Sequence, residues 1–315
     1  MFGKMPKTLR NTIKNTVQLH LLNNDGVAMG QCLTAVGWVG GTLPELYEED
    51  GMVELPMADV AGSGFVVGAA LAGKRPMYVI RYQGFNWFNA PIIINYACKS
   101  KEIWNRPCPM FIRSIAMEGG IGPVAGSSHH SLYYRMPGVK IYAPMSSSEY
   151  TATYNMFMDD DDVYYVSEHR GSYDNTDDLD DVIFDNPDII LFPISITRFA
   201  AIEASRRLLC LGIKAAVSHI WQIKPFEPSR DVLNDLSAAG RGVVIDDDYR
   251  DGIAKNLAFD MMAITHASMS VLGLADKTAG FHPAVDNLPP SAADITKHVI
   301  ATLQDKNNAI EKRIN

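Results

Sequence analysis

The chain has 315 residues, enough for more than one domain, and its 47% hydrophobic and 20% charged content is that of an ordinary folded protein. The net charge of −8 argues against a nucleic-acid-binding protein, because such proteins present a basic surface. No run of 18 apolar residues and no apolar signal segment occurs, and the four cysteines have no paired spacing, so we expect a cytoplasmic protein with free thiols, no membrane span and no metal site.

Helical and extended patterns alternate through the first 186 residues. Apolar residues recur at every fourth position over 9–21 and predict an amphipathic helix. The other elements expected here are strands at 27–29, 77–80, 110–115, 139–142 and 163–166, and helices directly after Asp59, at 90–104 and at 146–158. Ser146 and Glu149 form a capping-box pattern for the last of these helices. Glycines predict flexible loops at 37–41 and 119–126.

The same alternation continues after an acidic, loop-like stretch at 174–181, and we place the domain boundary at 186/187. The elements expected beyond it are strands at 189–192, 215–220, 242–245 and 269–272, and helices at 202–211, 229–239, 253–264 and 292–303. Strands that alternate with helices predict parallel sheets covered on both faces. The predicted fold class is therefore α/β, with two domains at 1–186 and 187–315, each a mostly parallel sheet flanked by helices.

One carboxylate, Asp59, lies in an apolar stretch at the start of a helix rich in small residues. The helix dipole favours the ionised carboxylate and burial favours the neutral acid, so such a group is suited to proton transfer. The simpler alternative is that Asp59 is only the N-cap of its helix. The glycines of this helix cost helix stability and indicate that another element packs close to its backbone.

The segment around Asp59 resembles the transketolase superfamily of thiamine-diphosphate enzymes, most closely the beta subunits of 2-oxo-acid dehydrogenase decarboxylase components. The matching residues are Pro56 and the small-residue run that ends in Ala72, Gly73, Arg75 and Pro76. Family members carry Glu where this chain has Asp59, so the resemblance implies that Asp59 is the catalytic acid that shares a proton with the cofactor's pyrimidine ring. The resemblance covers nearly the whole chain and implies a pyrimidine-binding domain followed by a transketolase C-terminal-type domain.

The resemblance also implies a cofactor-binding pocket. Tyr82 and Phe85 lie where family members place aromatic residues against the aminopyrimidine ring, and an aromatic face suits a flat heteroaromatic partner. Gln31 lies where family members often have Glu. Ordinary core packing is the alternative interpretation of the two aromatic residues.

Two adjacent histidines, His129 and His130, follow the glycine-rich loop and are flanked by serines. Histidines in a loop suit acid–base work near neutral pH, whereas a surface pair or an adventitious metal site is the alternative. Their similarity to the superfamily's substrate-side histidine loop implies that both are catalytic and handle protons on substrate oxygens. The later Glu168-His169-Arg170 resembles the end of the family's domain and is interpreted as a marker of the fold.

The chain lacks the Gly-Asp-Gly motif through which these enzymes bind the diphosphate and Mg²⁺. The resemblance therefore implies half of an enzyme. This chain would supply the pyrimidine-binding face of the thiamine-diphosphate site. An alpha-type subunit would supply the diphosphate site and the Mg²⁺, in an α₂β₂ assembly.

Three functions are compatible with these features. The first is a beta-type subunit that acts on a 2-oxo acid by decarboxylation and acyl transfer. The second is a split transketolase or carboligase that transfers a two-carbon unit between sugar-like substrates, which the form of the segment with His129 and His130 favours. The third is a non-catalytic paralogue that only assembles with a partner. Gln31 and Asp59 favour the third, because the carboxylate of Asp reaches about 1.5 Å less than that of Glu.

Overall fold

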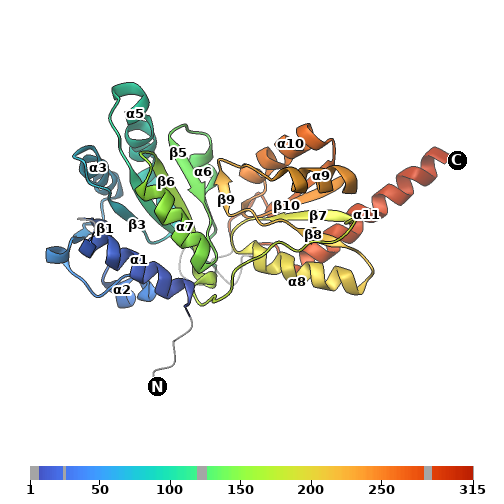
Figure 1. The fold of residues 1–315 in the computed structure, drawn as a ribbon, viewed down its shortest axis with the longest axis horizontal. Helices are drawn as coiled ribbons and strands as arrows, with labels where there is room; N and C mark the ends of the chain where they lie inside the picture. Colours follow the sequence, from blue (N-terminus) through green and yellow to red (C-terminus); the bar gives the residue numbers. More distant parts are fainter. Residues whose placement is uncertain (1–6, 24–25, 119–125, 280–285, 315) are drawn as a thin grey trace, which may run out of the picture. The chain divides into compact units, whose positions relative to one another are not determined.

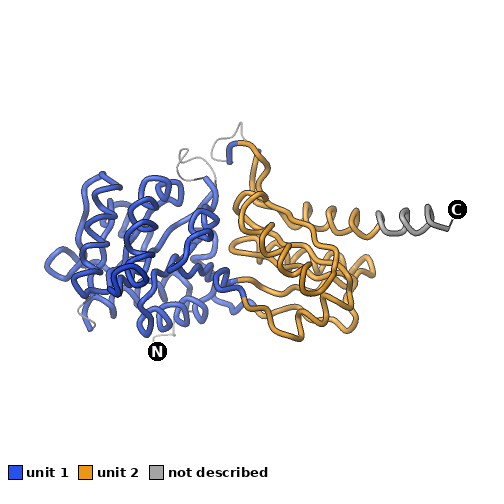
Figure 2. Tube along the Cα trace, turned by 90° about the horizontal axis from the view of Figure 1, so that it is seen from above, with its two compact units in different colours: residues 1–179, 221–226, 278–286 blue, residues 180–220, 227–277, 287–315 orange. Residues whose placement is uncertain are grey.

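The computed structural model describes residues 7–23, 26–118, 126–279 and 286–314. The chain divides into two compact units, drawn in blue and orange in Figure 2. Unit 1 comprises residues 1–179, 221–226 and 278–286, and unit 2 comprises 180–220, 227–277 and 287–315. The division thus falls after Leu179 rather than at 186/187. One reason is that Val182 already forms an antiparallel bridge with Val217 in unit 2.

Unit 1 is built on a seven-stranded sheet with the order β2-β1-β3-β4-β6-β5-β9. Its strands are β1 (Ala28–Gln31), β2 (Met52–Leu55), β3 (Met77–Ile80), β4 (Met110–Ala116), β5 (Val139–Tyr142), β6 (Val163–His169) and β9 (Gln222–Lys224). All neighbouring strands are parallel except β5 and β9. Strand β9 was not predicted, because a three-residue strand carries no periodic signal.

Helices cover both faces of this sheet. They are α1 (Leu9–Asn23), α2 (Ala35–Gly41), α3 (Asp59–Leu71), α4 (Asn86–Ile92), α5 (Cys98–Trp104), α6 (Ser131–Tyr134) and α7 (Ser147–Met158), with short 3-10 turns η1 (Glu48–Asp50), η2 (Gln83–Phe85) and η4 (Arg170–Ser172). Helices α1 and α7 lie side by side in Figure 1 and share one apolar core with Met77 and Val79 of β3. Side chains alternate along a strand, so Tyr78 and Ile80 face the opposite side, where α3 and α4 pack.

The helix predicted at 90–104 begins earlier, at Asn86, and is continuous through three segments. A π-helical segment, η3 (Ile93–Ala97), joins α4 to α5. The capping pattern of α7 holds in part: Ser146 accepts a hydrogen bond from the Glu149 backbone at 3.4 Å, but the Glu149 carboxylate accepts from the Met145 amide rather than from that of Ser146.

The glycine-rich loop expected at 37–41 is instead one left-handed helical turn within α2. Val36, Gly37, Trp38, Val39 and Gly40 all have φ between 52° and 64°. L-residues disfavour this conformation by roughly 1–2 kcal/mol each, and glycine adopts it freely. The other predicted loop, at 119–126, lies outside the described residues except for Gly126.

We expect alanine to have opposite effects at two glycines of unit 1. Gly37→Ala adds a Cβ at φ +60° and should lower the free energy of unfolding by about 1 kcal/mol, although no atom lies within 4 Å of the added carbon. Gly64→Ala, in the outer face of α3 and equally open, should raise it by about 0.5–1 kcal/mol. Urea unfolding of both variants measures these changes. Changes in the free energy of unfolding with the same sign and size in both variants would contradict the left-handed turn.

Unit 2 is a four-stranded, wholly parallel sheet with the order β11-β10-β7-β8. Its elements are β7 (Ile189–Pro193), α8 (Thr197–Cys210), β8 (Ala215–Val217), α9 (Arg230–Ala239), β10 (Arg241–Tyr249), α10 (Ile253–Thr265), β11 (Ser268–Leu274) and α11 (Ala292–Ile314). Helices α8 and α11 pack together and share a core with β7 and β10. The predicted α/β class with two mostly parallel sheets is therefore confirmed.

All four cysteines are free thiols, as their unpaired spacing predicted. Among the described residues, no helix combines the length and the apolar character that a membrane span requires.

Candidate cofactor-binding site

A cavity of about 150 Å³ opens in unit 1 where β1 and β3 end and α3 begins. All four residues that the sequence assigns to the cofactor line it: Gln31, Asp59, Tyr82 and Phe85. They come from three separate places in the chain, since Tyr82 and Phe85 belong to one segment after β3, and the parallel pairing of β1 with β3 brings two of these places together. Cavities of about 150 Å³ hold a molecule the size of benzene, so the space suits one flat ring.

Asp59 is the first residue of α3, and its carboxylate is held by a neighbouring helix. The N-cap position belongs to Ala58, so the N-cap alternative for Asp59 is wrong. Asn89 of α4 donates a hydrogen bond from Nδ2 to Asp59 Oδ1 at 2.8 Å. The Nδ2 atom of Asn89 also donates to the Phe85 carbonyl at 3.0 Å, which fixes the orientation of the amide.

The Asn89 amide is held in turn by Tyr78 of β3. The Tyr78 hydroxyl donates to Asn89 Oδ1 at 2.5 Å. Burial and, after it, the charge of Asp59 raise the pKa of Tyr78 well above its ordinary value, so the hydroxyl keeps its proton at neutral pH. A chain of two hydrogen bonds therefore runs from the sheet through Asn89 to the carboxylate.

On the prediction that Asp59 is the catalytic acid, Asn89→Ala should lower turnover by roughly 10- to 100-fold, because displacing a catalytic group by about 1 Å costs on the order of 100-fold. The variant removes the donor to Asp59 and leaves the buried Tyr78 hydroxyl without its acceptor. Asn95→Ala is the matched control, because Asn95 lies further along the same continuous helix, in η3, and its amide donates to the Pro91 carbonyl at 2.8 Å rather than to Asp59. Steady-state rates of the assembled enzyme check this, and equal rates for both variants would contradict it.

The remaining lining residues fit a flat heteroaromatic ring with polar edges. The rings of Tyr82 and Phe85 lie 6.1 Å apart between centroids at 37°, and the Arg81 guanidinium lies 5.7 Å from the Tyr82 ring centroid. Gln31 Nε2 is buried and has no hydrogen-bond partner among the described residues. A buried donor without a partner costs free energy, and a ring nitrogen in the cavity would satisfy it. Donor, carboxylate and aromatic faces together match an aminopyrimidine.

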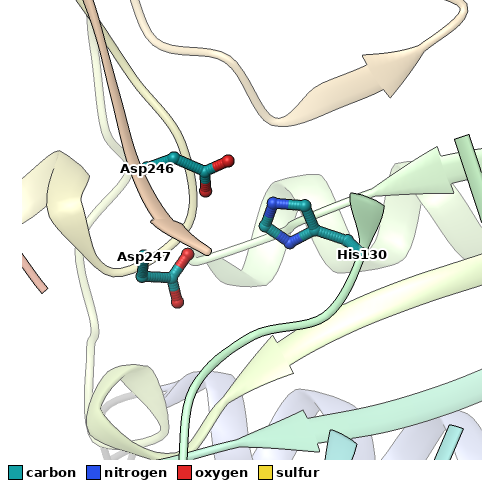
Figure 3. Close-up of side chains that lie close together, drawn as sticks. All are labelled: His130, Asp246 and Asp247. Atoms are coloured by element: carbon teal, nitrogen blue, oxygen red, sulfur yellow. The ribbon is translucent and has the colours of Figure 1, made fainter. Parts of the chain in front are cut away.

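The two candidate histidines, His129 and His130, are not among the residues that line this cavity. They precede α6 and are tied to the cavity's rim through Gln83, which lies between Tyr82 and Phe85. The backbone amide of His129 donates to Gln83 Oε1 at 2.6 Å, and His130 Nδ1 lies 3.2 Å from the Ser167 hydroxyl of β6. Figure 3 shows the His130 imidazole with its two ring nitrogens.

The buried amides that hold the Asp59 carboxylate and the His129 backbone were not predicted from the sequence. Gln83, Asn86 and Asn89 are each buried and recur at every third position of η2 and α4. This spacing places them on one face, and each donates hydrogen bonds to other elements of unit 1. Three amides at helical spacing in an apolar segment were therefore a signal that could have been found.

Neither Glu168 nor the adjacent pair Asp246 and Asp247 lines this cavity. Glu168 is buried in an ion pair with Arg113. Asp246 and Asp247, drawn in Figure 3, lie on strand β10 of unit 2, where the Ser195 hydroxyl donates to Asp247 at 3.0 Å.

Comparison with known families gives a direct match to this part of the chain. The model described as "Transketolase, pyrimidine binding domain" matches residues 8–176, which is more than half of the chain. The chain belongs to this transketolase family. The matched segment includes every residue of the cavity and both histidines.

The transketolase-family chain is similar over most of its length to several known proteins. It is 23% identical over 295 residues to the beta subunit of acetoin:2,6-dichlorophenolindophenol oxidoreductase of Cupriavidus necator, covering 86% of each chain. It is 23% identical over 333 residues to the pyruvate dehydrogenase E1 component subunit beta of Rickettsia bellii, covering 98% of each. A solved structure titled as a split gene transketolase, inactive beta4 tetramer, shares its fold with a TM-score of 0.70 at 17% identity, covering 94% of this chain and 98% of that one.

Proposed function

We propose that this chain is the pyrimidine-binding, beta-type subunit of a two-subunit thiamine-diphosphate enzyme that acts on a 2-oxo acid by decarboxylation and acyl transfer. The observation that carries this proposal is the cavity in which Asp59, held by Asn89, lies beside two aromatic rings and the unsatisfied Gln31 amide. The names of the relatives support it, because they are beta subunits of oxidoreductases for acetoin and pyruvate.

In this function each residue of the cavity has a separate task. Tyr82 and Phe85 would hold the aminopyrimidine ring, and Gln31 would donate a hydrogen bond to it. Asp59 holds and releases a proton at a ring nitrogen, and Asn89 keeps the carboxylate in place. Thiamine diphosphate, when bound, supplies a nucleophilic carbon and an electron sink for the 2-oxo acid. His129 and His130 donate hydrogen bonds to substrate oxygens.

The outer side of α3, α4 and α5 supports assembly with an alpha-type subunit. Gly64 and Gly68 lie one turn apart on α3 with open space in front of both, so another backbone can approach closely. Large apolar side chains are exposed on the same three helices: Phe65, Leu71, Trp87, Phe88, Ile103 and Trp104. An exposed apolar surface of this kind marks a protein interface. The alpha-type subunit would bring the diphosphate and Mg²⁺ site in an α₂β₂ assembly.

The proposal is tested by isothermal calorimetry of thiamine diphosphate with Mg²⁺ on this chain co-expressed with its alpha-type subunit. We expect saturable binding by the complex, and turnover of pyruvate or of a branched 2-oxo acid. A complex that binds no cofactor would overturn the proposal. Turnover of ketose donors with aldose acceptors, and of no 2-oxo acid, would replace it by the second candidate, a split transketolase.

A further inference from the structure

The amide of Gln83 has one orientation, because two backbone groups dictate it. Its Nε2 atom donates to the Ser114 carbonyl at 3.2 Å, and a carbonyl only accepts. Its Oε1 atom accepts from the His129 amide at 2.6 Å, and a backbone N–H only donates. The Tyr165 hydroxyl, 3.1 Å from the same oxygen, is a second donor to it. The side chain is fully buried, so water does not compete for these positions.

This orientation decides which way the Ser167 hydroxyl donates. The second hydrogen of Gln83 Nε2 points to Ser167 Oγ at 2.8 Å, so Ser167 accepts from Gln83. Among the residues that the structure describes, the acceptor left for the hydroxyl hydrogen of Ser167 is His130 Nδ1, at 3.2 Å. A nitrogen that accepts a hydrogen bond carries no proton. The neutral imidazole therefore has its hydrogen on Nε2.

We infer that Gln83 and Ser167 are positioning residues that fix His130 in the Nε2–H tautomer. Gln83 holds the backbone of His129, and Ser167 sets which nitrogen of His130 is a donor. The inference rests on the proposed function for its chemical meaning: an Nε2–H group donates a hydrogen bond to a substrate carbonyl oxygen and polarises it. The hydrogen bonds that fix the tautomer all join residues of this chain, so the tautomer itself is observable on the chain alone.

The test is the tautomer of His130, read from two-bond nitrogen–proton correlation spectra of the full chain with labelled histidine at neutral pH. The signal of His130 is the one lost in His130→Gln. We expect an unprotonated Nδ1 and a protonated Nε2 in the wild-type chain. Ser167→Ala should give a mixture of both tautomers, and Ser167→Thr, which keeps the hydroxyl, should restore the wild-type spectrum.

Ser114→Ala is the matched control. Ser114 is the direct neighbour of Ser167 across β4 and β6, and it too carries a buried hydroxyl. That hydroxyl accepts from Asn86 rather than contacting a histidine, and the Ser114 carbonyl remains for Gln83. Ser114→Ala should therefore leave the spectrum of His130 unchanged. A wild-type Nδ1–H tautomer, or equal spectra of wild type and Ser167→Ala, would overturn the inference.

The kinetic consequence is measured separately, on the complex with the alpha-type subunit. In Ser167→Ala we expect kcat to fall at least about tenfold with little change in KM, since a histidine in the wrong tautomer loses its role, and Ser167→Thr should recover the rate. An unchanged kcat together with a changed tautomer would overturn the assigned role of Ser167 in the reaction. A complex without any turnover contradicts the proposed function instead, and the spectra of the chain alone remain decisive for the tautomer.

Discussion

Replacing Asp59 by Asn is expected to lower turnover of the assembled enzyme by roughly 100- to 10,000-fold, the range that general acid–base catalysis contributes. The side-chain amide introduced at position 59 has the shape of the carboxylate and still offers an oxygen to the donor Nδ2 of Asn89, so the cavity should keep its form. It cannot exchange a proton with the pyrimidine ring. Because shape is kept and proton transfer is lost, the effect should appear in kcat, with cofactor affinity changed much less.

Steady-state kinetics and calorimetry of the same preparations separate these two effects. Glu49→Gln is the matched control, because it makes the same carboxylate-to-amide change at an exposed position of η1, outside the residues that line the cavity. Equal turnover of wild type and Asp59→Asn would show that Asp59 is not the acid. An inactive wild type that gains turnover on Asp59→Glu would support the non-catalytic paralogue, since the longer side chain restores the family's residue.

Replacing Glu168 by Gln is expected to lower the free energy of unfolding by about 3–5 kcal/mol, the cost of leaving a buried charge without its partner. The Arg113 guanidinium donates to both oxygens of Glu168, at 2.7 and 2.9 Å, and the two side chains are 0% and 1% exposed. Tyr173 and Tyr150 donate to the same carboxylate at 2.8 and 3.4 Å. In Glu168→Gln, the side-chain amide lacks the negative charge that balances Arg113, and its nitrogen is a hydrogen-bond donor where the carboxylate has an acceptor oxygen.

Urea unfolding compares this variant with Glu203→Gln. Glu203 pairs with Arg207 at 2.8 Å on the surface of α8, and their side chains are 45% and 50% exposed. An exposed pair one turn apart contributes only about 0.3–0.5 kcal/mol, so its loss should be close to the error of measurement. A loss below about 1 kcal/mol for Glu168→Gln would show that the buried pair is not a main support of unit 1.

The sequence alone determined the class of fold and the main residues of the cavity. Helices and strands with clear periodicity, such as α1, β3 and α9, were predicted within a few residues, because their patterns are local and repeat over several turns or alternations. Asp59, Tyr82 and Phe85 were found from two stretches of the chain that resemble a known family, one on each side of β3. That resemblance was enough to expect a shared cofactor cavity. In the structure, the three residues line one cavity together with Gln31.

The tertiary structure decided what holds these residues in place. Strand β9 joins the first sheet from residues 222–224, the α2 turn is left-handed, and Asn89 rather than the helix end binds Asp59. None of these follows from a local pattern, because each depends on partners far apart in the chain. The tautomer assigned to His130 shows this most clearly. It depends on Ser114 and Ser167 lying opposite each other on β4 and β6 and on a buried Gln83 that reaches both, and this register exists only once the sheet has formed.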